Sequence, residues 1–364
     1  MDIVRYVDPT WHHYCERDSE VMLSMYTNFK SFKNSKAQIK FSYIQDFGMD
    51  DIFNLEKKIR EHLEISNHVF VGFGEPIISY KDPKHGWDNE HDCYEGPFYY
   101  TDDFINRFAP TDKVTFFANA VSHVNLQRPF YYLNDMFFES RHIYDRYDIC
   151  KNLLKKLENK WDKKYSWELM CSNAVSLYKT LQEHQVNNQT FSTCHALGIT
   201  HWGPDVVAPK GGRLWAETFT AEHNIRCSDL IDPSIYNESY YSCVVETVIP
   251  ADNRMSMFSE KQAKPIVTQR PFIIVGTKDH LKAFRSLGFK TFAPVIDESY
   301  DDEPDYYKRI MMILDAMEKL SKRDPKEVYK ELYPVLEYNY KHFYNNKWNS
   351  ELQKAWLTPN LLIE

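Results

Sequence analysis

An α/β fold built on parallel sheets is the class that this sequence predicts. Three apolar runs have the length of strands, and segments with helical spacing separate them: Ser242–Val248, Pro271–Val275 and Thr291–Ile296. This alternation of strand and helix is typical of a parallel sheet with crossover helices. Because ligands bind beyond the carboxyl ends of the strands in such sheets, we expect the functional residues there.

The length and composition leave room for two domains of ordinary size. The chain has 364 residues, of which 43% are hydrophobic, and its formal net charge is −8. That charge argues against a basic protein that coats nucleic acid, although it is compatible with a local basic groove.

Cysteine usage and hydropathy predict where the protein works. The seven cysteines are scattered and include no CxxC pair, which indicates free thiols in a reducing environment. No apolar stretch approaches the length of a membrane span, and the first residues lack the apolar core of a signal peptide. We therefore expect a soluble cytoplasmic protein without a membrane partner.

The first 160 residues are predicted to form an α/β unit. Its elements are the strands Met1–Val7, Gln38–Tyr43 and Lys113–Ala120, a short buried strand that begins at His68, and the amphipathic helix Asp50–Leu63. The strand from His68 breaks into the turn Gly72-Phe73-Gly74, which brings backbone close to a ligand or makes a tight bend.

Two carboxylates of this region, Glu75 and Asp88, are our candidates for a catalytic base. Glu75 follows the glycine turn, where the carboxyl end of a strand would open on a cleft, and Asp88 lies in the acidic and aromatic loop Asp82–Glu95. Transfer by direct displacement needs a carboxylate that takes the proton of the acceptor hydroxyl. The alternative is an acidic, solvated loop. Histidines and acids of this loop could also bind a metal, but their spacing matches no metal motif, and we predict no metal site.

A second α/β unit is predicted from about residue 161. Its first elements are the strand Trp167–Ser172, the helix Asn173–His184 with Ser172-Asn173 as its cap, and a strand at Phe191-Ser192-Thr193. The loop Lys210-Gly211-Gly212-Arg213 follows. Its glycines and cations could hold a phosphate, or the loop could be a plain turn.

The tripeptide Ser259-Glu260-Lys261 carries the most specific chemistry. Ser259 can cap a helix, whose N-terminus favours a phosphate. Lys261 adds a positive charge, and Glu260 can accept hydrogen bonds from a ribose diol. Together they suit a nucleotide-sugar, whereas the alternative is an ordinary helix start, because this tripeptide is common.

The C-terminal part is predicted to be helical. Pro304–Lys322 forms one helix, and a second begins at Asp324-Pro325 with proline in its first position. The aromatic residues of Val328–Trp348 are interpreted as core packing, and Asp301-Asp302 as a surface turn.

Short motifs that follow one another between residues 232 and 300 carry a family resemblance. They are Asp232-Pro233-Ser234, Tyr240-Tyr241-Ser242, Glu246-Thr247, Ser259-Glu260-Lys261, Lys264-Pro265, Pro271–Gly276, Leu287–Phe292 and Asp297–Tyr300. This series resembles the donor-binding core of fucosyltransferase-like, family-10-type glycosyltransferases, as found in bacteriophages and giant viruses. For a viral chain, the expected location is the host cytoplasm.

The resemblance implies a GT-B fold, in which two Rossmann-like domains face a cleft. We accordingly expect an acceptor-binding domain over 1–160, a nucleotide-sugar-binding domain over 161–325, and C-terminal helices over 326–364 that pack back across the domain junction. The implied activity is an inverting, metal-independent glycosyl transfer from a UDP- or GDP-linked sugar, with no further cofactor.

The resemblance also assigns the donor site. It implies that Glu246, Ser259, Glu260 and Lys261 contact the nucleotide-sugar. The family usually carries arginines after the first strand of this domain, where this chain has Ala174-Val175-Ser176. We expect Lys179, the helix N-terminus at Asn173, and Arg213 to take over the contacts to the phosphates.

Three acceptor or activity classes follow. The resemblance is strongest to phage-encoded members, and phages use glycosyltransferases to decorate modified DNA bases. Our first expectation is therefore the hydroxyl of 5-hydroxymethylcytosine in double-stranded DNA, which would have to be flipped or exposed. A surface glycan or lipid-linked sugar is the competing acceptor. A noncatalytic GT-B-like binding module is the third reading, which the missing arginines would fit.

Overall fold

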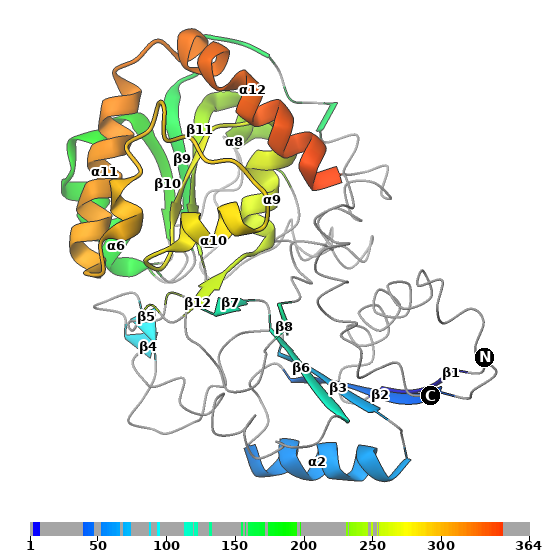
Figure 1. The fold of residues 1–364 in the computed structure, drawn as a ribbon. Helices are drawn as coiled ribbons and strands as arrows, with labels where there is room; N and C mark the ends of the chain where they lie inside the picture. Colours follow the sequence, from blue (N-terminus) through cyan, green and yellow to red (C-terminus); the bar gives the residue numbers. More distant parts are fainter. Residues whose placement is uncertain are drawn as a thin grey trace. The chain divides into compact units, whose positions relative to one another are not determined.

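A computed structural model gives the fold of the chain (Figure 1). It describes residues 3–7, 39–46, 52–65, 68–73, 87–88, 93–94, 113–118, 120–122, 131–132, 154–155, 157, 159–171, 174–194, 197, 231, 233–246, 249, 253 and 255–344. The described elements fall into two compact units. The first holds the elements of residues 3–73 and 113–132, and the second holds those of residues 87–94 and 154–344.

The first unit is a parallel sheet of five strands in the order β1-β2-β3-β6-β8. Its strands are β1 (Ile3–Val7), β2 (Ile39–Asp46), β3 (His68–Phe73), β6 (Val114–Ala118) and β8 (Tyr131–Tyr132). The helix α2 (Ile52–Ile65) connects β2 with β3, and Leu55 and Ile59 on its apolar face are buried. The strands and the helix predicted in this region are therefore confirmed.

Short strands complete the described part of the N-terminal half. β4 (Trp87–Asp88) and β5 (Cys93–Tyr94) form an antiparallel pair, in which Asp88 lies opposite Cys93. β7 comprises Ala120–Ser122. The segment predicted as an acidic loop thus contains a small hairpin.

The second unit is built on a four-stranded parallel sheet in the order β10-β9-β11-β13. The strands are β9 (Tyr165–Cys171), β10 (Thr190–Cys194), β11 (Ser239–Val245) and β13 (Phe272–Val275). Every residue of β11 and β13 is buried, as expected for strands that are covered on both faces. The α/β class is therefore confirmed, and this sheet is compatible with a Rossmann-like fold.

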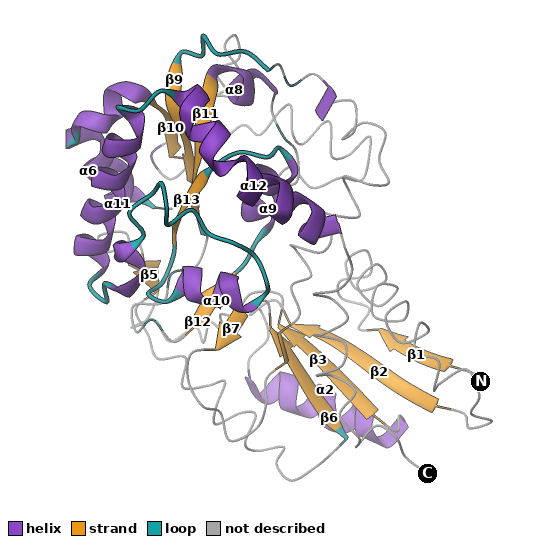
Figure 2. Ribbon diagram, turned by 45° about the horizontal axis from the view of Figure 1, so that its top comes forward, coloured by secondary structure: helices purple, strands orange, loops and turns teal. Residues whose placement is uncertain are grey.

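Helices cover both faces of this sheet. The connecting elements are α6 (Val175–Glu183), η3 (Gln185–Gln189), α8 (Pro233–Glu238), β12 (Met255–Met257), α9 (Glu260–Val267), α10 (His280–Ser286), η6 (Ser299–Asp302), α11 (Tyr306–Ser321) and α12 (Pro325–Tyr344). The helices α6 and α11 lie together on one side, and α9 and α12 lie together on the other (Figures 1 and 2).

The predicted strand Thr291–Ile296 is wrong, because the segment folds into turns. The backbone N–H groups of Val295 and Ile296 both donate to the carbonyl of Phe292, and the N–H of Phe292 donates to Glu298 Oε1. These local bonds use the N–H groups of Phe292, Val295 and Ile296, which then cannot donate to a neighbouring strand, and Pro294 is itself unfavourable for an inner strand.

Two predicted details at helix starts are also wrong. The N-cap residue of α6 is Ala174, which makes no side-chain cap, so the helix begins later than the predicted Ser172-Asn173 cap. Asp301 is not on a surface turn but is only 5% exposed. Its carboxylate accepts from the N–H groups of Leu281 (2.7 Å) and Lys282 (3.1 Å) at the start of α10.

The aromatic residues of α12 divide between two faces. The buried face consists of Val328, Leu332, Leu336, Asn339 and Phe343. Tyr333, Tyr338 and Tyr340 are exposed instead, so the interpretation of the aromatic stripe as core is wrong for these three. The helix belongs to the same compact unit as the four-stranded sheet. Its return across a domain junction stays a prediction, as do the domain boundaries at 160 and 325.

Asp301→Ala should lower the free energy of unfolding by about 1–2 kcal/mol, because it removes the cap of α10. The local cap position, Asp279, has a left-handed backbone (φ 62°) and makes no cap bond that would compensate. Urea denaturation measures the effect. The exposed neighbour Asp302 provides the matched control, and an Asp302→Ala loss as large as that of Asp301→Ala would contradict the capping role.

Candidate functional site

The order of the strands places a topological switch point between β9 and β11. From β9 the chain crosses to β10 on one side, and from β11 it crosses to β13 on the other. At such a point the crossovers separate and the carboxyl ends of the strands border a crevice where ligands bind. Glu246 directly follows β11, and its N–H donates to the carbonyl of Val275 at the end of β13 (3.1 Å).

The start of α9 lies at the same edge of the sheet. Ser259 has an extended backbone, and its hydroxyl accepts from the N–H of Lys261 (3.3 Å), so its predicted capping role is confirmed. Glu260 is buried in the first turn. The Lys261 ammonium lies 3.2 Å from Glu260 Oε1, and the Lys261 side chain is 26% exposed.

The Glu246 side chain is 3% exposed and is held by residues that the sequence reasoning missed. Gln262 Nε2, on α9, donates to Glu246 Oε1 (2.6 Å) and also lies 2.9 Å from Nε2 of His280 on α10. The His280 ring packs on Phe258, with ring centroids 4.8 Å apart. Gly276 makes room for this ring, because a Cβ there would lie 2.5 Å from His280 Nδ1.

Burial dominates the electrostatics of this carboxyl group. Removal from water raises the pKa of Glu246 to about 7, against the lowering effects of the Lys261 charge and the Gln262 hydrogen bond. The nearby hydroxyl of Ser259 also lowers the pKa, although the structure shows no hydrogen bond between the two side chains. Glu246 therefore changes charge near neutral pH, a property that functional carboxyl groups share with buried structural ones.

The lysines described at this edge are each paired with an acid. Lys261 contacts Glu260, while Lys278 (2.8 Å) and Lys282 (3.4 Å) both contact Asp279. Carboxylates accept hydrogen bonds, so the described part of this edge suits the hydroxyl groups of a ligand directly. A phosphate would have to draw a lysine away from its acid.

Of the other predicted site residues, Lys179 is the one whose side chain the structure describes, and it lies outside this group. Lys179 is an exposed residue of α6, and no contact links it to Glu246 or Lys261 in the described structure. Asp88 lies in β4. Glu75, Asn173 and Arg213 lie outside the described residues.

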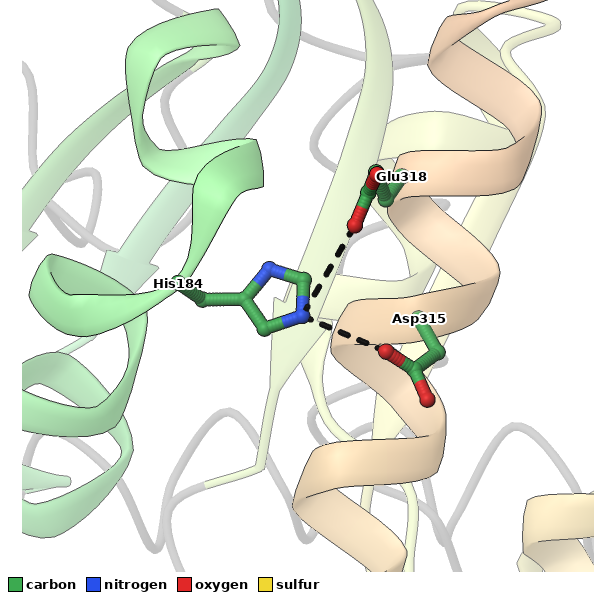
Figure 3. Close-up of side chains that lie close together, drawn as sticks. All are labelled: His184, Asp315 and Glu318. Carbon is green, nitrogen blue, oxygen red and sulfur yellow. Dashed lines mark hydrogen bonds and ion pairs between the residues drawn. The ribbon is translucent and has the colours of Figure 1, made fainter.

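A separate cluster of possible metal ligands joins η3 to α11 (Figure 3). His184 Nε2 lies 3.3 Å from Asp315 Oδ1 and 4.0 Å from Glu318 Oε2. However, His184 Nδ1 accepts from the N–H of Val186, so the neutral ring carries its proton on Nε2. A metal on Nε2 would move that proton to Nδ1, against the N–H of Val186. We therefore interpret the cluster as a polar contact between two elements.

A second buried carboxyl group, Glu168, lies within β9 opposite Ser242 of β11. Burial raises its pKa to about 7, against the opposing charge of Arg270. The Arg270 guanidinium donates to the carbonyls of Tyr236 and Tyr241 and to the hydroxyl of Ser239. These bonds tie α8 and β11 to Arg270, which lies two residues before β13.

No protein-family model, no curated protein and no solved structure matches this chain. Among the described residues, no helix is long and apolar enough to cross a membrane. The glycosyltransferase resemblance is thus carried by the quoted motifs alone.

The raised pKa of Glu246 predicts that stability falls as the pH rises. A carboxyl group with a folded-state pKa of about 7, above its ordinary 4.5, favours folding most below pH 4.5. That contribution is lost as the pH climbs through 7, and it amounts to about 3 kcal/mol. Glu246→Gln keeps a neutral group there, so its unfolding free energy should depend less on pH than that of the wild type.

Chemical denaturation at pH 5 and pH 8 measures this difference. Glu168→Gln, at the other buried carboxyl, should flatten the profile in the same window, and the two effects should add because the sites share no partner. A profile unchanged by Glu246→Gln would contradict the raised pKa.

Proposed function

We propose that this protein is a nucleotide-sugar-dependent glycosyltransferase whose donor binds at the carboxyl edge of the four-stranded sheet. The observation that carries the proposal is that Glu246 contacts Gln262 in the first turn of α9, beside Ser259-Glu260-Lys261, at a topological switch point. These motifs are 13 residues apart in sequence. The proposal adopts the GT-B arrangement of the resembling family, with the acceptor on the N-terminal unit.

The donor contacts follow from the chemistry of the side chains. The Lys261 ammonium exchanges Glu260 for an oxygen of the donor diphosphate, a charge-assisted hydrogen bond. The carboxylate of Glu260 that this exchange releases, together with Glu246, accepts hydrogen bonds from hydroxyl groups of the nucleotide-sugar. The partial positive charge at the start of α9 adds to the attraction for phosphate.

The transfer itself is an inverting displacement. A carboxylate of the N-terminal half, Glu75 or Asp88, takes the proton of the acceptor hydroxyl while the hydroxyl oxygen attacks the anomeric carbon of the sugar. The bond between that carbon and the diphosphate oxygen breaks, and the nucleoside diphosphate leaves with the electron pair. Held by Lys261 and a helix terminus, the leaving group needs no divalent ion.

The hydroxyl of 5-hydroxymethylcytosine in double-stranded DNA is the acceptor that we propose. A glycan or a lipid-linked sugar is the competing acceptor, and the net charge of −8 favours it, because DNA repels an acidic surface. A noncatalytic binding module is the second function. It is favoured by the pairing of each described lysine of the edge with an acid.

Lys261→Ala should weaken nucleotide binding by roughly 10- to 100-fold, because it removes a charged donor to the phosphate. A thermal-shift screen against UDP, GDP, CMP and their sugar conjugates identifies the nucleotide, and titration calorimetry gives the affinities. The exposed Lys282 of α10, which contacts the N-cap residue Asp279, supplies the control Lys282→Ala. If no nucleotide stabilises the wild type, the proposed function is wrong.

Glu75→Gln and Asp88→Asn separate an enzyme from a binding module. In an enzyme, the variant that removes the base should lower turnover by about 100-fold or more and leave donor affinity unchanged. Transfer of radiolabelled sugar to hydroxymethylated DNA, to oligosaccharides and to water measures turnover, and EDTA should not affect it. Donor binding without transfer or hydrolysis would favour the binding module.

A further inference from the structure

One oxygen of the buried Glu246 carboxylate at the candidate site has no hydrogen-bond partner. Glu246 Oε1 accepts from Gln262, whereas Oε2 has no hydrogen bond although it is buried. Burying a carboxylate oxygen without a hydrogen bond costs free energy. In a native protein such an oxygen therefore calls for a structural or functional explanation. Because Oε1 is held in place by Gln262 and Oε2 has no hydrogen bond, Oε2 is well placed to accept a hydrogen bond from a ligand.

The residue that fixes Oε1 is itself fixed. Gln262 is fully buried, and an amide NH₂ group has two hydrogens and no lone pair to offer. With one hydrogen on Glu246 Oε1, the other reaches His280 Nε2, 2.9 Å away. His280 Nε2 is therefore an acceptor, and the neutral ring carries its proton on Nδ1. The two bonds leave the amide a single orientation.

The histidine is locked by packing. Its ring lies between Phe258, which is fully buried, and the backbone at Gly276, where a Cβ would lie only 2.5 Å from Nδ1. Any side chain at position 276 would displace the ring. The chain thus brings together the end of β13, the start of α10, the start of α9 and the end of β11 to hold one carboxyl group.

We propose that Gln262 and His280 are positioning residues that orient the Glu246 carboxylate and keep it ionised for a hydroxyl-bearing ligand. This inference rests on the proposed function for the identity of the ligand, a nucleotide-sugar. Neither residue touches the ligand itself. His280 sets the orientation of the Gln262 amide, and the amide donates to Oε1, so Oε2 is left to accept from a ligand hydroxyl.

The charged groups around Glu246 give the expected pH dependence. Lys261 lowers its pKa and Glu260, the neighbour in α9, raises it, while the Gln262 hydrogen bond favours the ionised form. His280 acts on it through Gln262 and is neutral in this arrangement. Loss of the Gln262 donor should therefore raise the pKa of Glu246 above about 7 and deplete the ionised acceptor at neutral pH.

The first test needs no nucleotide. Carbon-13 NMR of protein labelled at the glutamate carboxyl carbons follows the titration of Glu246. The Glu246 signal is assigned as the one that is lost in Glu246→Gln. Gln262→Leu should raise the midpoint by about one pH unit, and His280→Phe, which keeps a ring against Phe258, should raise it by less. Ser256→Ala is the control, because it removes the buried contact with Thr277 at the same edge (3.0 Å) and leaves the Gln262 bond in place.

The second test uses whichever of UDP, GDP and their sugar conjugates binds the wild type. Gln262→Leu should weaken that affinity about tenfold at pH 7, and the pH midpoint of binding should rise with the carboxyl midpoint. An unchanged titration of Glu246 in both Gln262→Leu and His280→Phe overturns the positioning role. A shifted titration of Glu246 with an unchanged nucleotide affinity would show that the Glu246 carboxylate does not contribute to ligand binding. If no nucleotide binds the wild type, the proposed function fails, and the NMR titration still decides the positioning role.

Discussion

Burial of the polar groups at the carboxyl edge of the four-stranded sheet is the constraint on which the second unit depends. The strands β11 and β13 are covered on both faces, so the chain that leaves them carries Glu246 and Thr277 inside the protein. A buried polar group without a partner costs about 1–3 kcal/mol. The chain meets this constraint with Gln262 of α9, which donates to Glu246, and with Ser256 of β12, which contacts Thr277; the first of these contacts lies in the candidate site.

Side-chain hydrogen bonds to backbone groups also hold the loops outside the sheet in place. Arg270, just before β13 in the chain, donates to the carbonyls of Tyr236 and Tyr241. Asp301 accepts from backbone N–H groups at the start of α10. Asn339 of α12 accepts from the N–H of Lys290 and donates to its carbonyl, as a neighbouring strand would. With these bonds in place, Phe292 and Ile296 of the apolar run after α10 are buried through turns, and the described sheet ends at β13.

Periodicity predicted most elements of both units because apolar spacing reports which face is buried. It failed where one side chain decides the structure, as Glu298 does for the turns after Lys290 and Asp301 does for α10. Ser259 and Glu246 were found through local chemistry and motif order. Gln262 and His280 were missed because a single buried polar residue has no pattern. The available signal was Gln262 itself, a polar residue four positions before the buried Ile266 on one helical face.

The charged side chains at this edge restrict which ligands can bind there more than the fold does. Lys261 is already neutralised by Glu260, and Glu246 adds a second acid whose ionisation burial opposes. An anionic ligand gains little from a lysine that is already paired unless the freed carboxylate finds a donor in the same ligand. A nucleotide-sugar satisfies both demands, since its phosphates accept from the ammonium and its hydroxyls donate to the carboxylates. Inorganic phosphate satisfies only the first, so this edge should discriminate between ligands through their hydroxyl groups rather than their charge.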